Sequence, residues 1–236
     1  MSSIDFLYLN EQDMIKAGVT DMSGCVDAME EMFRLLKAGD FRMGGPESNS
    51  HGVMMTFPEQ SAFPNMPVDG PDRRFMAMPA YLGGRFDMVG MKWYGSNVEN
   101  KKKDLPRSVL MLTLNCKDTG APLAYMSANL LSAYRTGAVP GVGIRYCARE
   151  DAKVVGIVGP GVMSKTALSS TLAVRPGIEK VKINGRSKRS IDSFIAYVKE
   201  NHPGISDFEV VDTIEAAVRE ADIVHIATSS PTGDVN

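Results

Sequence analysis

From residue 153 onward, short apolar runs alternate with amphipathic segments. The runs KVVGIVG, KVKING, DFEVVD and DIVHIATS have the length and composition of buried strands. Between them, MSKTALSSTLAV, RSIDSFIAYVKENH and TIEAAVREA have the apolar spacing that is typical of helices. Strands that alternate with helices predict βαβ units and a parallel sheet, so we expect a Rossmann-type α/β domain over residues 151–236.

The first 150 residues have a different pattern. An amphipathic helix is indicated around CVDAMEEMFRLLKAGD, and residues 44–71 are irregular. Strand-like runs follow in FMAMPAYLG, FDMVGMKWYG and SVLMLTLNC, and DTGAPLAYM indicates a turn into another strand. This pattern predicts an α+β domain over residues 1–150, which we expect to bind substrate and to form a dimer.

Charge excludes some classes of partner. The 236 residues contain 26 basic and 28 acidic side chains, a formal net charge of -2, which creates no field that would attract nucleic acid or an anionic membrane. The run Lys101–Lys103 is followed by Asp104 and indicates a solvated loop. We therefore expect a small-molecule ligand, with neither nucleic acid nor membrane as a partner.

The cysteines and the N-terminus indicate a cytoplasmic protein. Cys25, Cys116 and Cys147 are far apart and in no CxxC arrangement, so neither a disulfide framework nor a metal site is predicted. The first residues contain acids early, and no 18 apolar residues run together, so secretion and membrane spanning are not expected.

The stretch GIVGPGVMSK combines a strand end with a glycine turn. Gly159, Gly161 and Ser164 give the pattern G-x-G-x-x-S, and Val162 and Met163 open the following helix. Such a turn brings the backbone close to a pyrophosphate and aims helix N–H groups at it. The motif alone also fits a plain strand–loop–helix corner, since serine replaces the third glycine and Pro160 has no N–H. Its βαβ context favours dinucleotide binding.

The end of the next predicted strand bears on cofactor choice. An NAD-binding fold places a carboxylate there for the adenosine ribose, whereas this chain has Gly185, Arg186, Ser187 and Lys188. Guanidinium, hydroxyl and ammonium donors suit a 2′-phosphate, so NADP(H) is favoured and NAD(H) remains an alternative. A basic, solvated helix start is the competing interpretation. At the fourth strand's end, Thr228 and Ser229 are expected near the nicotinamide.

A family resemblance rests on more specific motifs. The segment from MPAYLGGRFDMVGMKWYGSN through TGAPL and AYRTGA to the glycine turn resembles the ornithine cyclodeaminase and mu-crystallin family over about residues 70–230. The resemblance implies hydride exchange between a nicotinamide and a carbon that bears nitrogen, in an amino acid or its imine. It also implies a homodimer.

Three cations are assigned by this resemblance. Arg42, Lys92 and Arg135 are expected to bind the substrate carboxylate, with Lys92 also the catalytic base or proton relay and Arg135 also in contact with the cofactor. Each has a simpler interpretation: Arg42 complements a helix end, Lys92 faces water, or Arg135 pairs with an acid. Family members run to longer chains, and their catalytic acid would lie beyond residue 236. The resemblance also implies an alternative to an enzyme, a nucleotide-dependent ligand-binding or accessory protein that is mu-crystallin-like or a subunit of an amine-oxidising system.

Overall fold

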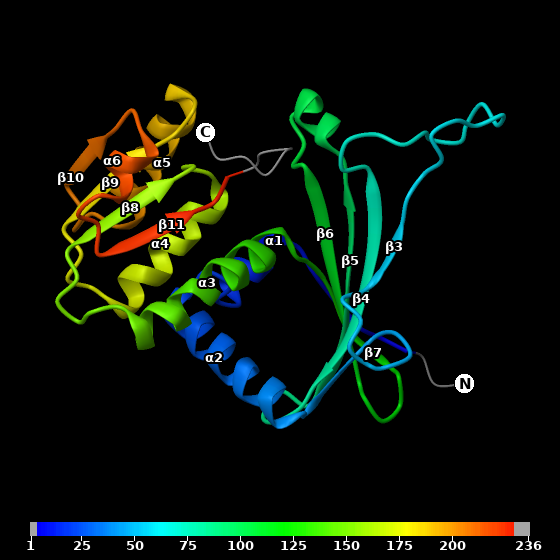
Figure 1. Cartoon of the computed structure of the whole chain (residues 1–236). Helices are drawn as coiled ribbons and strands as arrows, with labels where there is room; N and C mark the ends of the chain where they lie inside the picture. The colour runs from blue at the N-terminus through cyan, green and yellow to red at the C-terminus, as the bar shows by residue number, and fades with distance from the viewer. Residues whose placement is uncertain (1–3, 229–236) are drawn as a thin grey trace. The chain divides into compact units, whose positions relative to one another are not determined.

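The computed structural model describes residues 4–228, which divide into two compact units (Figure 1). The first unit runs to Val19 and continues over Glu31–Ser132, and the second comprises Thr20–Glu30 and the chain from Ala133 onward. The helices α2 (Met22–Ala38) and α3 (Asn129–Cys147) both cross this division. The division therefore lies earlier in the chain than residue 150, because most of α3 belongs with the parallel sheet.

The first unit is built on a mixed seven-stranded sheet. Its strands are β1 (Leu7–Leu9), β2 (Phe41–Met43), β3 (Val53–Met55), β4 (Arg74–Leu82), β5 (Met88–Ser96), β6 (Ser108–Asn115) and β7 (Pro122–Ser127). The order is β1-β7-β6-β5-β4-β2, with β3 also paired to β4. All pairs are antiparallel except β1 with β7. The short strand β3 lies inside the segment that the sequence predicts to be irregular.

Short helical segments complete this unit. The helix α1 (Glu11–Lys16) begins at a capping box, in which Asn10 and Asp13 satisfy each other's backbone N–H groups. Met14 of α1 packs on Ala124 and Met126 of β7, with Leu112 and Leu114 of β6 beside them. The 3-10 turn η1 (Val98–Lys103) joins β5 to β6. One face of the sheet therefore has its own small core.

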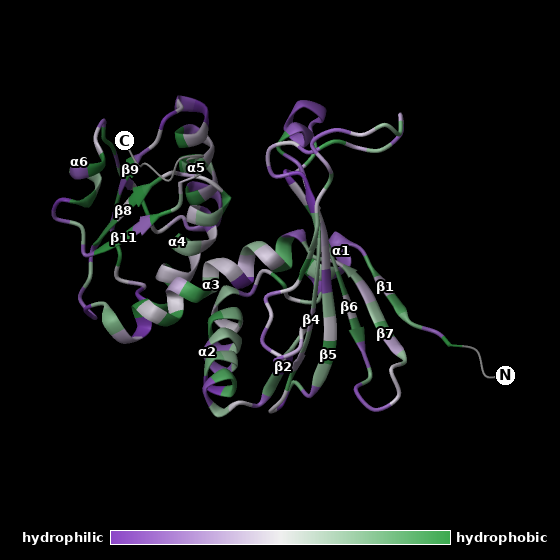
Figure 2. Cartoon of the chain, turned by 45° about the vertical axis from the view of Figure 1, so that its right-hand side comes forward, coloured by the Kyte–Doolittle hydropathy of each residue, from purple (hydrophilic) through white to green (hydrophobic). Residues whose placement is uncertain are grey.

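The second unit is a parallel sheet with helices between its strands. The strands are β8 (Val154–Val158), β9 (Lys180–Asn184), β10 (Asp207–Val210) and β11 (Ile223–Ile226), in the order β10-β9-β8-β11. The helices are α4 (Val162–Val174), α5 (Lys188–Asn201) and α6 (Ile214–Val218). Figure 2 shows β8 largely in the hydrophobic colour, as expected for a strand that is covered on both faces. The predicted Rossmann-type sheet and the preceding α+β part are confirmed.

The two faces of this sheet are covered by different helices. Val155 and Ile157 of β8 are fully buried in a cluster with Leu168 of α4 and Phe194 of α5. A Cβ added to Gly156 would lie 2.2 Å from the carbonyl oxygen of Ala217, so this residue faces α6 at close approach. Successive strand residues thus alternate between the two helical layers.

Helix α3 packs closely on α4. A Cβ at Gly137 would lie 2.3 Å from side-chain atoms of Thr166, and one at Gly141 would lie 2.8 Å from Ser170. Arg175 then fixes the end of α3, because its guanidinium donates to main-chain carbonyls that include those of Ile144 and Ala148. Within residues 4–228, no helix is long and apolar enough to span a membrane.

Candidate dinucleotide and substrate sites

The glycine turn follows β8 and opens directly into α4. Gly159 has φ 85°, and a Cβ there would lie 2.6 Å from the carbonyl oxygen of Ala227, so only glycine fits. Gly161 is the N-cap residue, and a Cβ there would meet nothing within 4 Å. Within residues 4–228, no side chain caps α4. The turn therefore leaves the helix N–H groups open to an anion, and Val162 and Met163 are the first residues that offer them.

The side chain of Ser164 packs inside the turn, and a contact of this residue with the pyrophosphate remains a prediction. Its side chain is fully buried, and its Oγ donates to the carbonyl oxygen of Gly159 at 2.6 Å. The hydroxyl thus fastens the turn from within. Its place in the motif is that of the third glycine, where close packing of helix on strand is needed.

The connection after β9 gives its four residues distinct surroundings. Gly185 allows close packing, since a Cβ there would lie 2.7 Å from the ring of Pro160. Ser187 caps α5 by accepting from the N–H of Ser190, and Lys188 pairs with Asp192 at 3.3 Å. Arg186 is exposed and has no hydrogen bond or ion pair with any described residue. Arg186 is thus the side chain of this group that is open to a ligand.

A cavity of about 310 Å³ lies on the β11 side of the turn. It is lined by Thr136 of α3, by His225 of β11 and by apolar residues of three elements: Gly137, Pro140, Met163, Ala167, Ile226 and Ala227. All of these belong to the second unit. Because β8 and β11 are the strands where the chain order reverses, the cavity lies at the position where open α/β sheets bind ligands.

His225 is a buried imidazole in the wall of this cavity. Its side chain is 8 % exposed, and Nε2 lies 2.7 Å from Thr171 Oγ1 on α4. Burial lowers the pKa of His225 to about 4, so the ring is neutral at pH 7. Burial within the predicted strand DIVHIATS would by itself account for this histidine. Its position at the end of the fourth strand was the signal that could have marked it as a binding residue.

The first-unit cations, Arg42 and Lys92, lie on different strands. Lys92 is partly buried on β5, with Nζ 5.1 Å from the centroid of the Tyr94 ring, and is paired in register with Met78 of β4. Arg42 of β2 is paired with Tyr81 of β4. Its guanidinium donates to the carbonyl oxygens of Gly39, at 3.2 Å, and Phe41, at 2.6 Å. Positions 78 and 81 of one strand point to opposite faces. The described geometry does not bring Arg42 to Lys92.

Arg135 and Thr228 belong to the second unit and are exposed. Thr228 lies beside the glycine turn, since its Cγ2 would be 3.3 Å from a Cβ at Gly159. Ser229 lies outside the described residues. Joint binding of one substrate by Lys92 and Arg135 remains a prediction, because these residues lie in different units.

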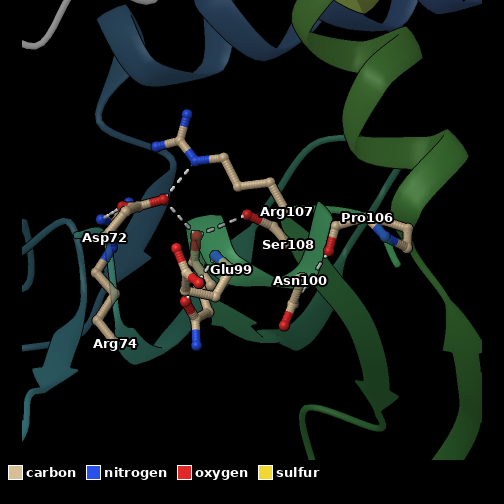
Figure 3. Close-up of polar contacts among 9 residues, drawn as sticks. Asp72, Arg74, Glu99, Asn100, Pro106, Arg107 and Ser108 are labelled. Carbon is tan, nitrogen blue, oxygen red and sulfur yellow. Dashed lines mark hydrogen bonds and ion pairs between the residues drawn. The ribbon is translucent and has the colours of Figure 1, made fainter. Parts of the chain in front are cut away.

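A second polar cluster braces one end of the first-unit sheet. Asp72 accepts from Ser96 Oγ at 2.5 Å and from Arg107 Nε at 2.5 Å, and it also pairs with Arg74 (Figure 3). Ser108 donates in turn to Ser96 at 3.0 Å. The carboxylate thus ties β4, β5 and β6 together. This cluster has the contacts of a structural brace.

An apolar cavity of about 440 Å³ lies beside that brace. Phe75 and Trp93 stack in its wall with ring centroids 5.7 Å apart, and Val109 and Met111 of β6 lie next to them. These side chains occupy the face of the sheet opposite to Lys92, because Lys92 alternates with Trp93 along β5. This face is apolar and partly exposed.

Comparison with known proteins gives related sequences and structures. The chain is 27 % identical over 225 residues to an N-((2S)-2-amino-2-carboxyethyl)-L-glutamate dehydrogenase of Staphylococcus aureus, an alignment that covers 95 % of this chain and 63 % of the relative. A Delta(1)-pyrroline-2-carboxylate reductase of Thermococcus litoralis, solved with NADH and L-proline, matches with a TM-score of 0.76 and 28 % identity over 94 % of this chain and 62 % of its own.

An archaeal alanine dehydrogenase dimer with bound NAD matches with a TM-score of 0.73 and 27 % identity, over 93 % of this chain and 59 % of that structure. The chain therefore spans less than two thirds of the length of these relatives. The family model for ornithine cyclodeaminase and mu-crystallin matches residues 18–233. The chain belongs to the ornithine cyclodeaminase/mu-crystallin family.

Proposed function

We propose that this chain is part of an NAD(P)-dependent oxidoreductase or cyclodeaminase that acts at the carbon–nitrogen centre of an amino acid or its imine. The observation that carries the proposal is the uncapped start of α4 behind Gly159 and Gly161, at the reversal point of a parallel sheet. The relatives named above are a dehydrogenase, an imine reductase solved with NADH and a dehydrogenase solved with NAD, which supports the same chemistry here.

In this proposal, bound nicotinamide gives or takes the hydride and the chain's own residues bind substrate and move protons. Arg135 binds the substrate carboxylate, because an exposed guanidinium forms two parallel hydrogen bonds with it. Lys92 holds or releases the proton of the substrate nitrogen. The proposal rests on its partly buried position on β5, with Nζ 5.1 Å from the centroid of the Tyr94 ring.

The alternative is a nucleotide-dependent binding or accessory protein. The experiment that separates the two follows reduced nicotinamide absorbance while the full-length protein is incubated with NAD(H) or NADP(H) and a panel of amino acids, amines and cyclic imines. Turnover of one substrate supports the enzyme. Dinucleotide binding without turnover in either direction supports the binding protein.

We also propose that the dinucleotide is NADP(H). Arg186 is open to a ligand and follows β9, where no carboxylate is present to accept from a ribose hydroxyl. One charge-assisted pair contributes about 1.5 to 3 kcal/mol, so we expect NADPH to bind at least about tenfold more tightly than NADH. In calorimetry, Arg186→Ala should remove most of that difference, whereas Lys188→Ala should leave it, because Lys188 pairs with Asp192. Equal affinities in the unmutated protein would contradict the proposal.

A homodimer through the first-unit sheet is a further part of the proposal. The apolar face around Trp93 and Val109 is left partly exposed by a single copy, so a second copy could cover it. One related structure is a dimer. Light scattering should give two copies, and Val109→Glu should shift the mass toward one copy. Lys101→Glu, on the neighbouring 3-10 turn η1, is the matched control and should leave the dimer intact. A monomer in the unmutated protein would refute the dimer.

A cytoplasmic location also belongs to the proposal. It rests on Cys25, Cys116 and Cys147, which form no disulfide in the structure, and on the cofactor, which is an intracellular metabolite. Fractionation of cells that express the full-length protein should recover it with cytoplasmic enzymes. Recovery from the medium or from membranes would contradict this assignment.

A further inference from the structure

One ring nitrogen of His225 is satisfied by no group among residues 4–228. Nε2 bonds Thr171, and Nδ1 has no partner among the described residues. Every buried side-chain nitrogen or oxygen in residues 4–228 does have a hydrogen-bond partner. Nδ1 is therefore open to space, although the side chain as a whole is 8 % exposed. The space available is the 310 Å³ cavity that His225 lines.

Thr171 fixes which ring nitrogen holds the proton. The threonine hydroxyl has one hydrogen, and Oγ1 donates it to the carbonyl oxygen of Ala167 at 2.9 Å. The contact with His225 is then satisfied only if Nε2–H donates to Oγ1. The ring is neutral at pH 7, so Nδ1 presents a lone pair to the cavity.

Sheet topology identifies the half of the dinucleotide that this cavity receives. The phosphate-binding turn follows β8, and the predicted adenosine contacts follow β9, on one side of it. The cavity lies at β11, on the other side, and shares Met163 with the start of α4. A dinucleotide centred on the turn therefore extends its nicotinamide half toward His225.

The cavity walls suit a planar ring with one polar substituent. Apart from His225 and Thr136, the lining residues are apolar or glycine. A ribose with several hydroxyl groups would leave donors unsatisfied against such walls, whereas the nicotinamide ring needs a partner only for its carboxamide. The lone pair of Nδ1 requires a donor, which the amide N–H supplies.

We propose that His225 is a cofactor-binding residue whose Nδ1 accepts a hydrogen bond from the nicotinamide carboxamide, with Thr171 as the positioning residue that sets the tautomer. This inference rests on the proposed function of a nicotinamide-dependent protein. Neither the glycine turn nor the basic residues after β9 would reveal it, because the turn concerns the pyrophosphate and the basic residues concern the adenosine half of the cofactor.

The test compares three ligands by calorimetry on the full-length protein and on His225→Leu. NADH has the amide N–H, its 3-acetylpyridine analogue has a methyl ketone instead, and ADP-ribose has no nicotinamide ring. We expect His225→Leu to weaken NADH about tenfold and to change the other two affinities by less than about twofold. His225→Gln keeps an acceptor oxygen and should recover part of the NADH affinity.

The other outcomes are also informative. Equal weakening of all three ligands would make His225 a structural residue and overturn the inference, as would unchanged NADH affinity. If NADH and NADPH both bind the unmutated protein but His225→Leu leaves their affinities unchanged, only this inference fails. If the unmutated protein binds neither NADH nor NADPH, the proposed function fails as well.

A second measurement avoids dependence on a folded variant. Nitrogen NMR of the unmutated protein should show the His225 Nδ1 resonance shift when NADH binds. ADP-ribose should leave that resonance in place. An Nδ1 resonance that is insensitive to NADH, or that responds equally to ADP-ribose, would overturn the inference.

Discussion

Lowering the pH from about 7.5 to about 5 should destabilise this protein by about 2 kcal/mol through His225 alone. Burial holds the pKa of this imidazole at about 4 in the folded chain, while an unfolded chain leaves it near 6.5. Above pH 6.5, the His225 imidazole is neutral in the folded and in the unfolded chain, so its titration does not change the free energy of unfolding. Below pH 6.5, the imidazole of the unfolded state binds a proton that the folded state does not bind. The free energy of unfolding therefore decreases as the pH is lowered, by about 3 kcal/mol in total between neutral pH and pH 4.

Urea unfolding at both pH values, for the unmutated protein and for His225→Leu, isolates this contribution. Carboxylates also titrate as the pH falls, but they are present in both proteins and cancel in the comparison. The unmutated protein should lose about 2 kcal/mol more than the variant between the two pH values. Equal losses would refute the assignment of a neutral, buried imidazole to this position.

Three further outcomes are expected. Gly159→Ala should abolish dinucleotide binding in calorimetry, because the added Cβ would lie 2.6 Å from the carbonyl oxygen of Ala227 at φ 85°; binding within about twofold of the unmutated protein would contradict this. Arg175→Lys should lower the free energy of unfolding by about 2 kcal/mol, since an ammonium cannot reach the several carbonyls that the guanidinium binds; an unchanged urea midpoint would show that this cap is unimportant. Asp72→Asn should destabilise the first unit by about 1 to 3 kcal/mol, because two arginines lose their partner; unchanged thermal unfolding would rule out the brace.

For the second unit, the local pattern of apolar and polar residues was sufficient to predict the fold. The strand β8 is a buried apolar run, β9 and β10 alternate apolar with polar residues, and the helix α5 has an apolar face, so the βαβ order followed from spacing. The first unit was harder to predict because its sheet pairs strands that are distant in sequence. β1 joins β7 across more than one hundred residues, and β3 is a short exposed strand with little apolar alternation. Such pairing depends on tertiary contacts that no local window contains.

The candidate site shows the same limit. Gly159 and Gly161 were identified because a turn of this kind has a sequence pattern. Ser164 was expected at the pyrophosphate, whereas its hydroxyl is buried against Gly159, a contact that depends on the helix rotation. No sequence pattern marks His225 as a binding residue, because its open Nδ1 depends on a hydrogen bond between its other ring nitrogen and Thr171 of a separate helix. Hydrogen-bond satisfaction is a property of the fold and not of the motif.

The most direct test of the central claim is a crystal structure of the full-length protein with NADPH. We expect the pyrophosphate against the backbone N–H groups of Val162 and Met163, the adenosine 2′-phosphate beside Arg186, and the nicotinamide in the cavity beside His225. A dinucleotide bound away from the turn at Gly159–Gly161, or crystals that exclude it at saturating concentration, would contradict the account.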